Sequence, residues 1–73
     1  MACISPDGKP TGSGLALLRV LKAGPRPPDE VAMETGRPVF AVRSGLRELE
    51  GAALVVRKGE DYELAPAAME YVE

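Results

Sequence analysis

The sequence predicts a small, mostly helical domain with a short antiparallel pair of strands ahead of a last short helix. Apolar residues recur at three- and four-residue steps over 39–53, residues 54–65 read as a strand, a turn and a strand, and glycine or proline separates the apolar segments. The 73 residues, 45% of them hydrophobic, are near the lower limit for a single stable core. We therefore expect one domain over 1–73, with residues 1–12 as an extended N-terminal arm.

The first helix is expected over 13–23, because Thr11 or Ser13 can cap its start and a glycine-proline pair can end it. Its inward stripe is expected to consist of Leu17, Val20 and Leu21. Leu15 and Leu18 lie beside this stripe and add apolar surface. Either a second subunit or, equally well, the N-terminal arm would cover that surface.

Two more helices, joined by a tight turn, are expected over 28–35 and 38–51. Pro28 suits a first helical position, and the two acidic residues after it favour the positive end of a helix. Gly36 can take a positive φ and end the first of these helices, and Pro38 starts the second. The buried stripe of the second helix is expected to consist of Val39, Val42, Leu46, Leu49 and Ala53. The pair is a helix-turn-helix pattern.

The opposite face of the second helix is expected to carry Phe40, Arg43, Ser44 and Arg47. In the DNA major groove, arginine can donate two hydrogen bonds to guanine, and an apolar group can contact the thymine methyl group. On residue type alone, the stronger interpretation is that these arginines solvate an exposed helix and pair with Glu48 or Glu50.

After the second helix, strands are expected near 54–57 and 61–65, with Arg57 and Lys58 in the turn between them. A last helix over 66–72 would open at a proline. Its expected contacts are Ala67, Met69 and Val72. The side chains that would either close the core or contact a second subunit are Leu15, Met69 and Tyr71.

This order of elements resembles the winged helix-turn-helix domains of bacterial and archaeal transcriptional regulators, with MarR-like and ArsR-like proteins as the nearest broad comparison. The resemblance runs from about Leu15 to the C-terminus. The residues that carry it are Val31-Ala32, Gly36, Val42, Leu46-Arg47-Glu48-Leu49, Ala53-Leu54-Val55 and the segment VVRKGEDYEL. The chain departs from the pattern at Ala53, where the related regulators commonly have glycine, so we expect a shifted helix end.

The resemblance implies sequence-specific binding of double-stranded DNA by a small transcriptional regulator without a cofactor. The recognition helix would lie near 38–51 and the wing near 54–65. The residues implied to contact DNA are Arg37, Phe40, Arg43, Ser44, Arg47, Arg57 and Lys58. Of these, Arg43, Ser44 and Arg47 would read base edges, and the basic residues at 37, 57 and 58 would touch the backbone. One such helix reads few base pairs, so a homodimer is expected.

A protein-protein interaction adaptor is the alternative function, because the net charge of −2 and the pI of about 5.1 do not favour binding to the phosphate backbone of a nucleic acid. Basic residues are nevertheless concentrated in the second motif helix and the wing. Surface potential separates the two functions. The adaptor is favoured if Glu48, Glu60 and Asp61 lie level with Arg43 and Arg47.

Catalysis and metal binding are not expected. The chain has no histidine, one cysteine, and neither a Gly-x-Ser-x-Gly motif nor a phosphate-binding glycine loop with its Gly-Lys-Ser/Thr signature. Cys3 is expected to be a small apolar residue or an unremarkable thiol. Without a signal sequence or an apolar segment of membrane-spanning length, we expect a cytoplasmic protein with no membrane partner.

Overall fold

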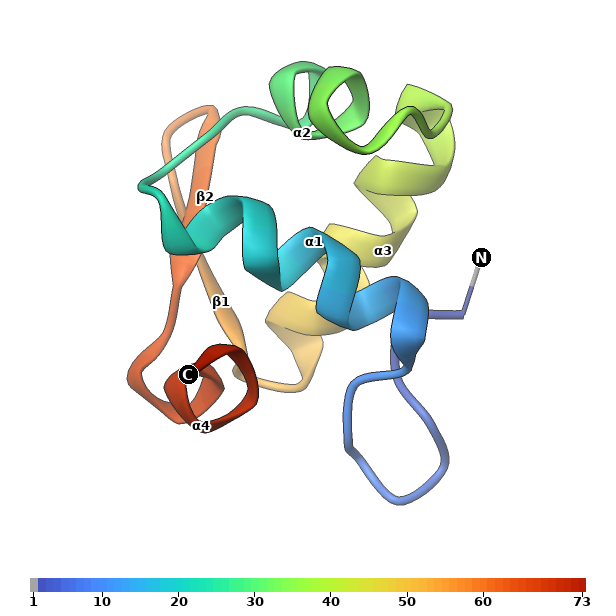
Figure 1. The fold of residues 1–73 in the computed structure, drawn as a ribbon, viewed down its shortest axis with the longest axis vertical. Helices are drawn as coiled ribbons and strands as arrows, with labels where there is room; N and C mark the ends of the chain where they lie inside the picture. Colours follow the sequence, from blue (N-terminus) through green and yellow to red (C-terminus); the bar gives the residue numbers. More distant parts are fainter. Residues whose placement is uncertain (1) are drawn as a thin grey trace.

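Three helices, a two-stranded wing and a short C-terminal helix make up the computed structural model, which describes residues 2–73 (Figure 1). In chain order, the elements are α1 (Gly12–Lys22), α2 (Pro28–Thr35), α3 (Val39–Gly51), β1 (Val55–Lys58), β2 (Asp61–Leu64), the 3-10 turn η1 (Pro66–Ala68) and α4 (Met69–Val72). This is the predicted winged helix-turn-helix fold. The ends of the elements lie within one residue of the predicted positions.

The first helix, α1, is the centre of the core, because α2, α3, β2 and α4 all pack against it. Thr11 caps it, since its Oγ1 accepts a hydrogen bond from the Gly14 backbone nitrogen at 3.2 Å. Leu17 and Leu21 are buried as predicted, and Val20 is only half-buried. The prediction that Leu18 lies beside the buried stripe is wrong, because neighbours on several sides widen the buried face of α1.

The helix-turn-helix follows the local signals in the sequence. α2 begins at Pro28 and ends at Thr35, and the capping residue Gly36 has a left-handed φ of 70° and donates its backbone N–H to the Ala32 carbonyl. In α3, the predicted core residues Val42, Leu46 and Leu49 are fully buried. The predicted burial of two other stripe residues, Val39 and Ala53, is wrong. Val39 lies in the first turn, at the edge of the core, and Ala53 lies beyond the helix end.

The end of α3 has the expected shift. Gly51 is the last helical residue, Ala52 caps the helix, and Ala53 has a φ of 62°. The Leu54 backbone nitrogen then donates to the Leu49 carbonyl at 2.9 Å, which closes the turn into β1. An alanine therefore occupies a left-handed position that glycine adopts at lower cost.

The wing is an antiparallel pair in which Val55 lies opposite Leu64 and Lys58 lies opposite Asp61. Arg57 and Lys58 are the last residues of β1, so their predicted position in the turn is wrong; Gly59 and Glu60 form the turn. The connector between α1 and α2 is hydrogen-bonded to β2 of this pair. Arg26 and Tyr62 exchange two backbone hydrogen bonds, 3.0 and 2.8 Å long, which fix the wing beside the start of α2.

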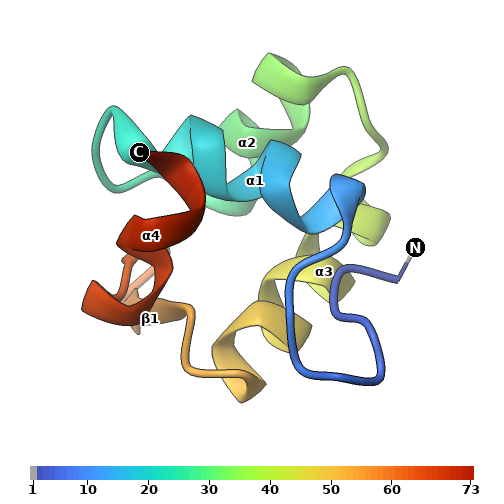
Figure 2. The ribbon, with the colours of Figure 1, turned by 60° about the horizontal axis from the view of Figure 1, so that its bottom comes forward.

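The N-terminal arm runs beside α3 toward the start of α1 (Figure 2). Cys3 is fully buried in the core, and its backbone nitrogen donates to Glu48 Oε1 at 3.3 Å. The Thr11 backbone nitrogen donates to the Cys3 carbonyl at 2.9 Å. The arm thus contributes to the core, and Leu18 belongs to the same buried cluster as Cys3 and is fully buried within the single chain.

The rest of the arm is a closed turn. The Ser5 nitrogen donates to the Lys9 carbonyl, and the Gly8 nitrogen donates to the Ser5 carbonyl, each at 2.9 Å. Inside this turn, the Asp7 carboxylate accepts hydrogen bonds from the Ser5 hydroxyl and the Lys9 backbone nitrogen.

The C-terminal helix is rotated from its expected orientation. Ala68 and Val72 are buried, whereas Ala67 is exposed and Met69 is 42% exposed, so two of the three expected contacts are wrong. The helix begins as a 3-10 turn, with about three residues per turn, which changes the face that later residues present. Tyr71 packs half-buried against the core, as Leu15 does in α1.

Candidate nucleic-acid interface

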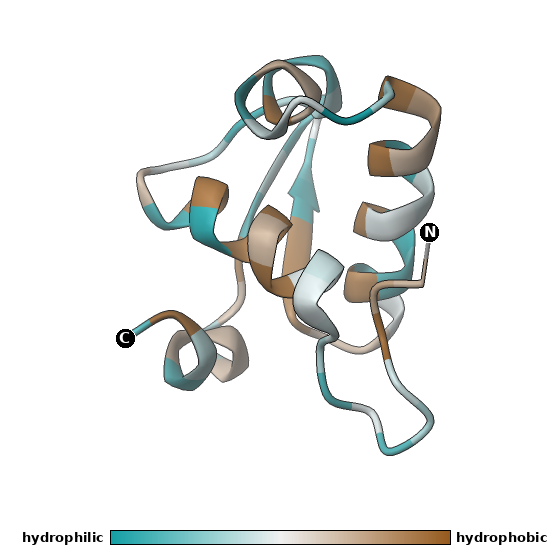
Figure 3. Cartoon of the chain, turned by 45° about the vertical axis from the view of Figure 1, so that its right-hand side comes forward, coloured by the Kyte–Doolittle hydropathy of each residue, from teal (hydrophilic) through white to brown (hydrophobic). Residues whose placement is uncertain are grey.

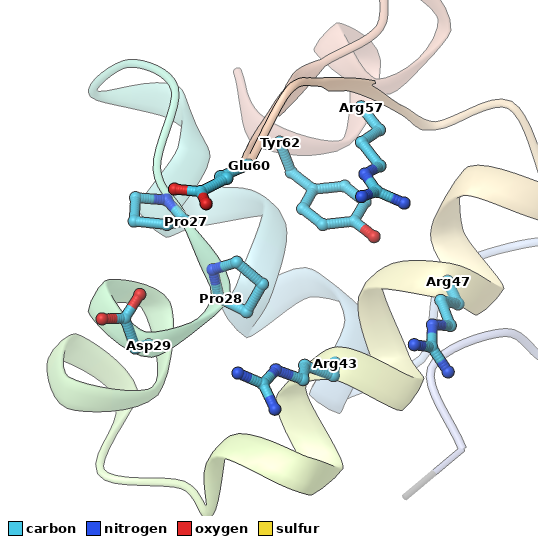
Figure 4. A pocket seen from close by; sticks show the side chains of 8 residues that line it. All are labelled: Pro27, Pro28, Asp29, Arg43, Arg47, Arg57, Glu60 and Tyr62. Atoms are coloured by element: carbon cyan, nitrogen blue, oxygen red, sulfur yellow. The ribbon is translucent and has the colours of Figure 1, made fainter.

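An open groove lies between α3, the start of α2 and the wing (Figure 4). Its volume is about 380 Å³. The residues that line it are Pro27, Pro28, Asp29, Arg43, Arg47, Arg57, Glu60 and Tyr62. Three elements far apart in the sequence therefore meet at one surface, and the Arg26–Tyr62 backbone hydrogen bonds hold two of them together.

Three arginines are the main cationic groups of the groove. Arg43 and Arg47 lie about one turn apart on the exposed face of α3, because Val42 and Leu46 turn the other face into the core. Arg57 comes from β1, and its Nε donates to the Gly59 carbonyl at 3.0 Å. That hydrogen bond holds the guanidinium group at the wing. The helix and the wing thus present positive charge to the same space.

Two carboxylates line the same groove. Asp29 comes from the first turn of α2, and Glu60 comes from the wing turn. Within residues 2–73, no carboxylate oxygen lies within 4.0 Å of the side-chain nitrogens of Arg43, Arg47 or Arg57. The arginines are therefore not paired with Glu48 or Glu50 in the described part of the chain.

The three acidic residues that discriminate between DNA binding and an adaptor lie in different places. Glu60 is level with the arginines, whereas Glu48 accepts the Cys3 backbone hydrogen bond from the arm. Asp61, next to Glu60 in the chain, does not line the groove. The groove is thus partly neutralised, by one of the three expected acids and by Asp29, which the sequence analysis did not identify.

The other four predicted DNA-binding residues lie outside the groove lining. Ser44 is exposed on α3, and Phe40 is 75% exposed in its first turn, where Figure 3 shows a hydrophobic segment at the edge of the molecule. Lys58 Nζ pairs with Glu63 Oε1 at 2.7 Å. Arg37 is half-buried, and its Nη1 donates to Ser13 Oγ at 3.3 Å, at the start of α1.

Met33 is an exposed residue outside the predicted site. It lies on α2, is 80% exposed and lines a second hollow with Arg26, Glu30 and Glu34. Arg26 Nε lies 3.3 Å from Glu34 Oε2 and 3.8 Å from Glu30 Oε2. A helical projection of this short segment places Met33 opposite the buried Val31–Ala32 pair, and this signal was available in the sequence.

Two groups of the N-terminal arm, Cys3 and Asp7, have shifted pKa values. Burial raises the pKa of the Cys3 thiol, and the nearby Glu48 carboxylate raises it further. The hydrogen bond from the Ser5 hydroxyl lowers the pKa of the exposed Asp7 carboxyl. Among residues 2–73, no group of three or more histidine, cysteine or acidic side chains is placed to hold a metal ion. None of the described helices has the length and hydropathy needed to cross a membrane.

No family model and no curated protein matches the chain. Among solved structures, ZitR of Lactococcus lactis, a MarR-family regulator, has a TM-score of 0.81 at 20% identity, over 99% of this chain and 51% of that chain. CalO1, a methyltransferase in calicheamicin biosynthesis solved with bound SAH, has a TM-score of 0.72 at 27% identity, over 81% of this chain and 18% of that chain.

A second methyltransferase is also similar. RosA, the N,N-8-amino-8-demethyl-D-riboflavin dimethyltransferase of Streptomyces davawensis, has a TM-score of 0.67 at 32% identity, over 77% of this chain and 17% of that chain. The matched part of each methyltransferase is its winged-helix domain. The chain thus spans about half of the regulator and under a fifth of each methyltransferase. It has the winged-helix fold, which the regulator and the methyltransferase domains share.

Proposed function

We propose that this winged-helix domain binds double-stranded DNA as a small transcriptional regulator. The observation that supports the proposal best is the convergence of Arg43, Arg47 and Arg57 on one open groove. Guanidinium groups bind phosphates and guanine edges through paired hydrogen bonds. With α3 in the major groove, the wing arginine would lie beside the sugar-phosphate backbone.

Each side chain has a distinct role in this proposal. Arg43, Ser44 and Arg47 read base edges, because they are exposed on α3 opposite its buried face. Phe40 contacts a thymine methyl group from the first turn of the same helix. Arg57 holds the DNA backbone from the wing.

Two predicted backbone contacts have weaker support. Lys58 is already paired with Glu63, so its contribution is smaller than that of Arg57. Arg37 contacts Ser13 away from the groove lining, so its contact with phosphate would be peripheral.

We further propose that the protein is not an enzyme, needs no cofactor and works as a homodimer. One recognition helix contacts few base pairs, and two half-sites one helical turn apart are the usual source of selectivity. Sedimentation equilibrium at micromolar concentration tests the dimer. A clean monomer, both alone and with DNA, would contradict this part of the proposal.

Fluorescence anisotropy with a labelled mixed-sequence duplex tests DNA binding at low and near-physiological salt. The wild-type affinity is expected to fall steeply with salt, and Arg43→Ala and Arg47→Ala are each expected to weaken binding. Arg19→Ala is the matched control, because Arg19 is exposed on α1 and does not line the groove. On a selected cognate site, Arg47→Ala should cost about 1–3 kcal/mol. Equal affinities for Arg47→Ala and Arg19→Ala would remove the base-reading assignment.

A protein-interaction adaptor is the second candidate function. Two carboxylates in the groove and the exposed Phe40 and Met33 side chains favour it, since aromatic and arginine side chains are enriched at protein contacts. The winged-helix domains of the two methyltransferases are also more similar to this chain in sequence than ZitR is. Failure of the wild-type protein to bind DNA even at low salt would favour this function.

A further inference from the structure

The carboxylates of Asp29 and Glu60 have no evident place in a surface built to hold phosphate. They reduce the formal charge of the groove lining from +3 to +1. Asp29 has a structural role, because an acidic side chain in the first turn of α2 interacts favourably with the positive end of that helix. Glu60 has no such role, since its carboxylate makes no hydrogen bond or ion pair with any residue from 2 to 73.

We propose that Asp29 and Glu60 limit the sequence-independent affinity of the groove for DNA, so that stable binding requires base contacts from α3. This inference rests on the proposed function. Phosphates attract arginines at every DNA sequence, and this attraction supplies essentially all of non-specific binding. A carboxylate in the same groove repels a phosphate that enters it, whatever the sequence.

The position of these acids matters more than the net charge of the chain. The Debye length is about 8 Å at physiological ionic strength, so an acidic group far from the bound phosphate is largely screened. Glu60 and Asp29 line the groove that a phosphate would enter, so a phosphate bound there would lie close to both carboxylates. Arg43 and Arg47 retain their hydrogen bonds to base edges, which become the deciding favourable contribution on a cognate site.

The chain contains matched controls for this inference. Asp61 is the next residue after Glu60 but does not line the groove, and Glu70 is exposed on α4, away from the groove. Glu60→Gln, Asp61→Asn and Glu70→Gln each remove one negative charge. Only the first of these changes the charge of the groove lining. Asp29→Asn is the second groove variant, and its melting temperature is measured in parallel because of its position in the first turn of α2.

The experiment measures the Kd of each full-length variant for a mixed-sequence duplex by anisotropy, at about 50 mM and about 150 mM salt. Glu60→Gln should bind about three- to tenfold more tightly than the wild type at the lower salt, with a smaller gain at the higher salt. Asp29→Asn should also bind more tightly. The two control variants should change Kd by less than about twofold.

Equal gains for Glu60→Gln and Glu70→Gln would overturn the inference, because net charge and not position would then set the affinity. If the wild type binds with the expected dependence on Arg43 and Arg47 but both groove variants have its affinity, the inference fails and the proposed function stands. If neither the wild type nor any variant binds at low salt, both fail.

Discussion

Gly14 lies so close beneath Cys3 that a Cβ atom at position 14 would overlap the Cys3 carbonyl oxygen. The same Cβ atom would come within 3.3 Å of the Pro10 side chain. The arm crosses the first turn of α1 at this point, and Thr11 both caps the helix and binds the Cys3 and Ala2 carbonyls. A residue without a side chain therefore allows the arm to complete the core.

Gly14→Ala should destabilise the domain by about 1–3 kcal/mol, because the added methyl group must displace the arm backbone. Glycine-to-alanine changes inside helices normally stabilise a protein, so a loss of stability in Gly14→Ala would point to the contact with the arm. Gly12→Ala, in the same helix turn, is the control, since a Cβ atom there meets nothing within 4 Å. Urea unfolding followed by circular dichroism measures both variants. Stabilisation by Gly14→Ala would show that the arm is not packed on α1.

Ala53→Gly should stabilise the domain by about 0.5–1 kcal/mol, because glycine takes the left-handed conformation at lower cost than alanine. Ala52→Gly is a control one residue earlier, where φ is −89° and glycine has no such advantage. That variant should be neutral or destabilising. Thermal unfolding compares the two, and equal effects would contradict a strained helix end at Ala53.

The Cys3 thiol should react slowly with iodoacetamide at about pH 8, at least about tenfold more slowly than in urea-unfolded protein. Burial blocks access and raises the pKa of the thiol, so less thiolate is present in the folded protein than in the unfolded chain. The associated stability is fully present below the ordinary thiol pKa and decreases as pH rises above it. Mass spectrometry of the intact protein at successive times gives the rate of alkylation. Equal rates with and without urea would contradict burial of Cys3.

Arg57→Ala should weaken binding about equally on all duplexes and reduce the magnitude of the salt slope by about one, as expected for a phosphate contact. Lys58→Ala is the neighbouring control in β1, and its effect should be smaller because Lys58 already pairs with Glu63. Anisotropy titrations over a salt series measure both slopes. A larger loss for Lys58→Ala would reverse the assignment of the backbone contact.

Local signals predicted the fold well because they act within a few residues of each element. Pro28, Gly36 and Pro38 mark the ends of two helices through backbone geometry alone, and the structure has those ends. Which part of the molecule covers Leu18 was not predictable in this way. It depends on how many elements surround α1 and on the arm that joins the core.

The candidate site could be predicted only in part. Arg43 and Arg47 were predictable because both lie on one face of a regular helix, whose period is known. Asp29 and Glu60 lie 31 residues apart, and the backbone pairing of Arg26 with Tyr62 helps to bring their elements together. The Lys58–Glu63 ion pair likewise depends on the register of β1 against β2, and that register is seen only in the structure.

The closed turn between Ser5 and Lys9 offers a place to attach a probe. Its two ends are joined by a backbone hydrogen bond of 2.9 Å, so an inserted peptide would leave and re-enter the chain at nearly the same point. Figure 1 shows this turn at the end of the molecule opposite the wing tip and α2. Exposed polar turns tolerate insertion better than packed elements do. A fluorophore or affinity tag placed there would report on binding while leaving the arginine groove unobstructed.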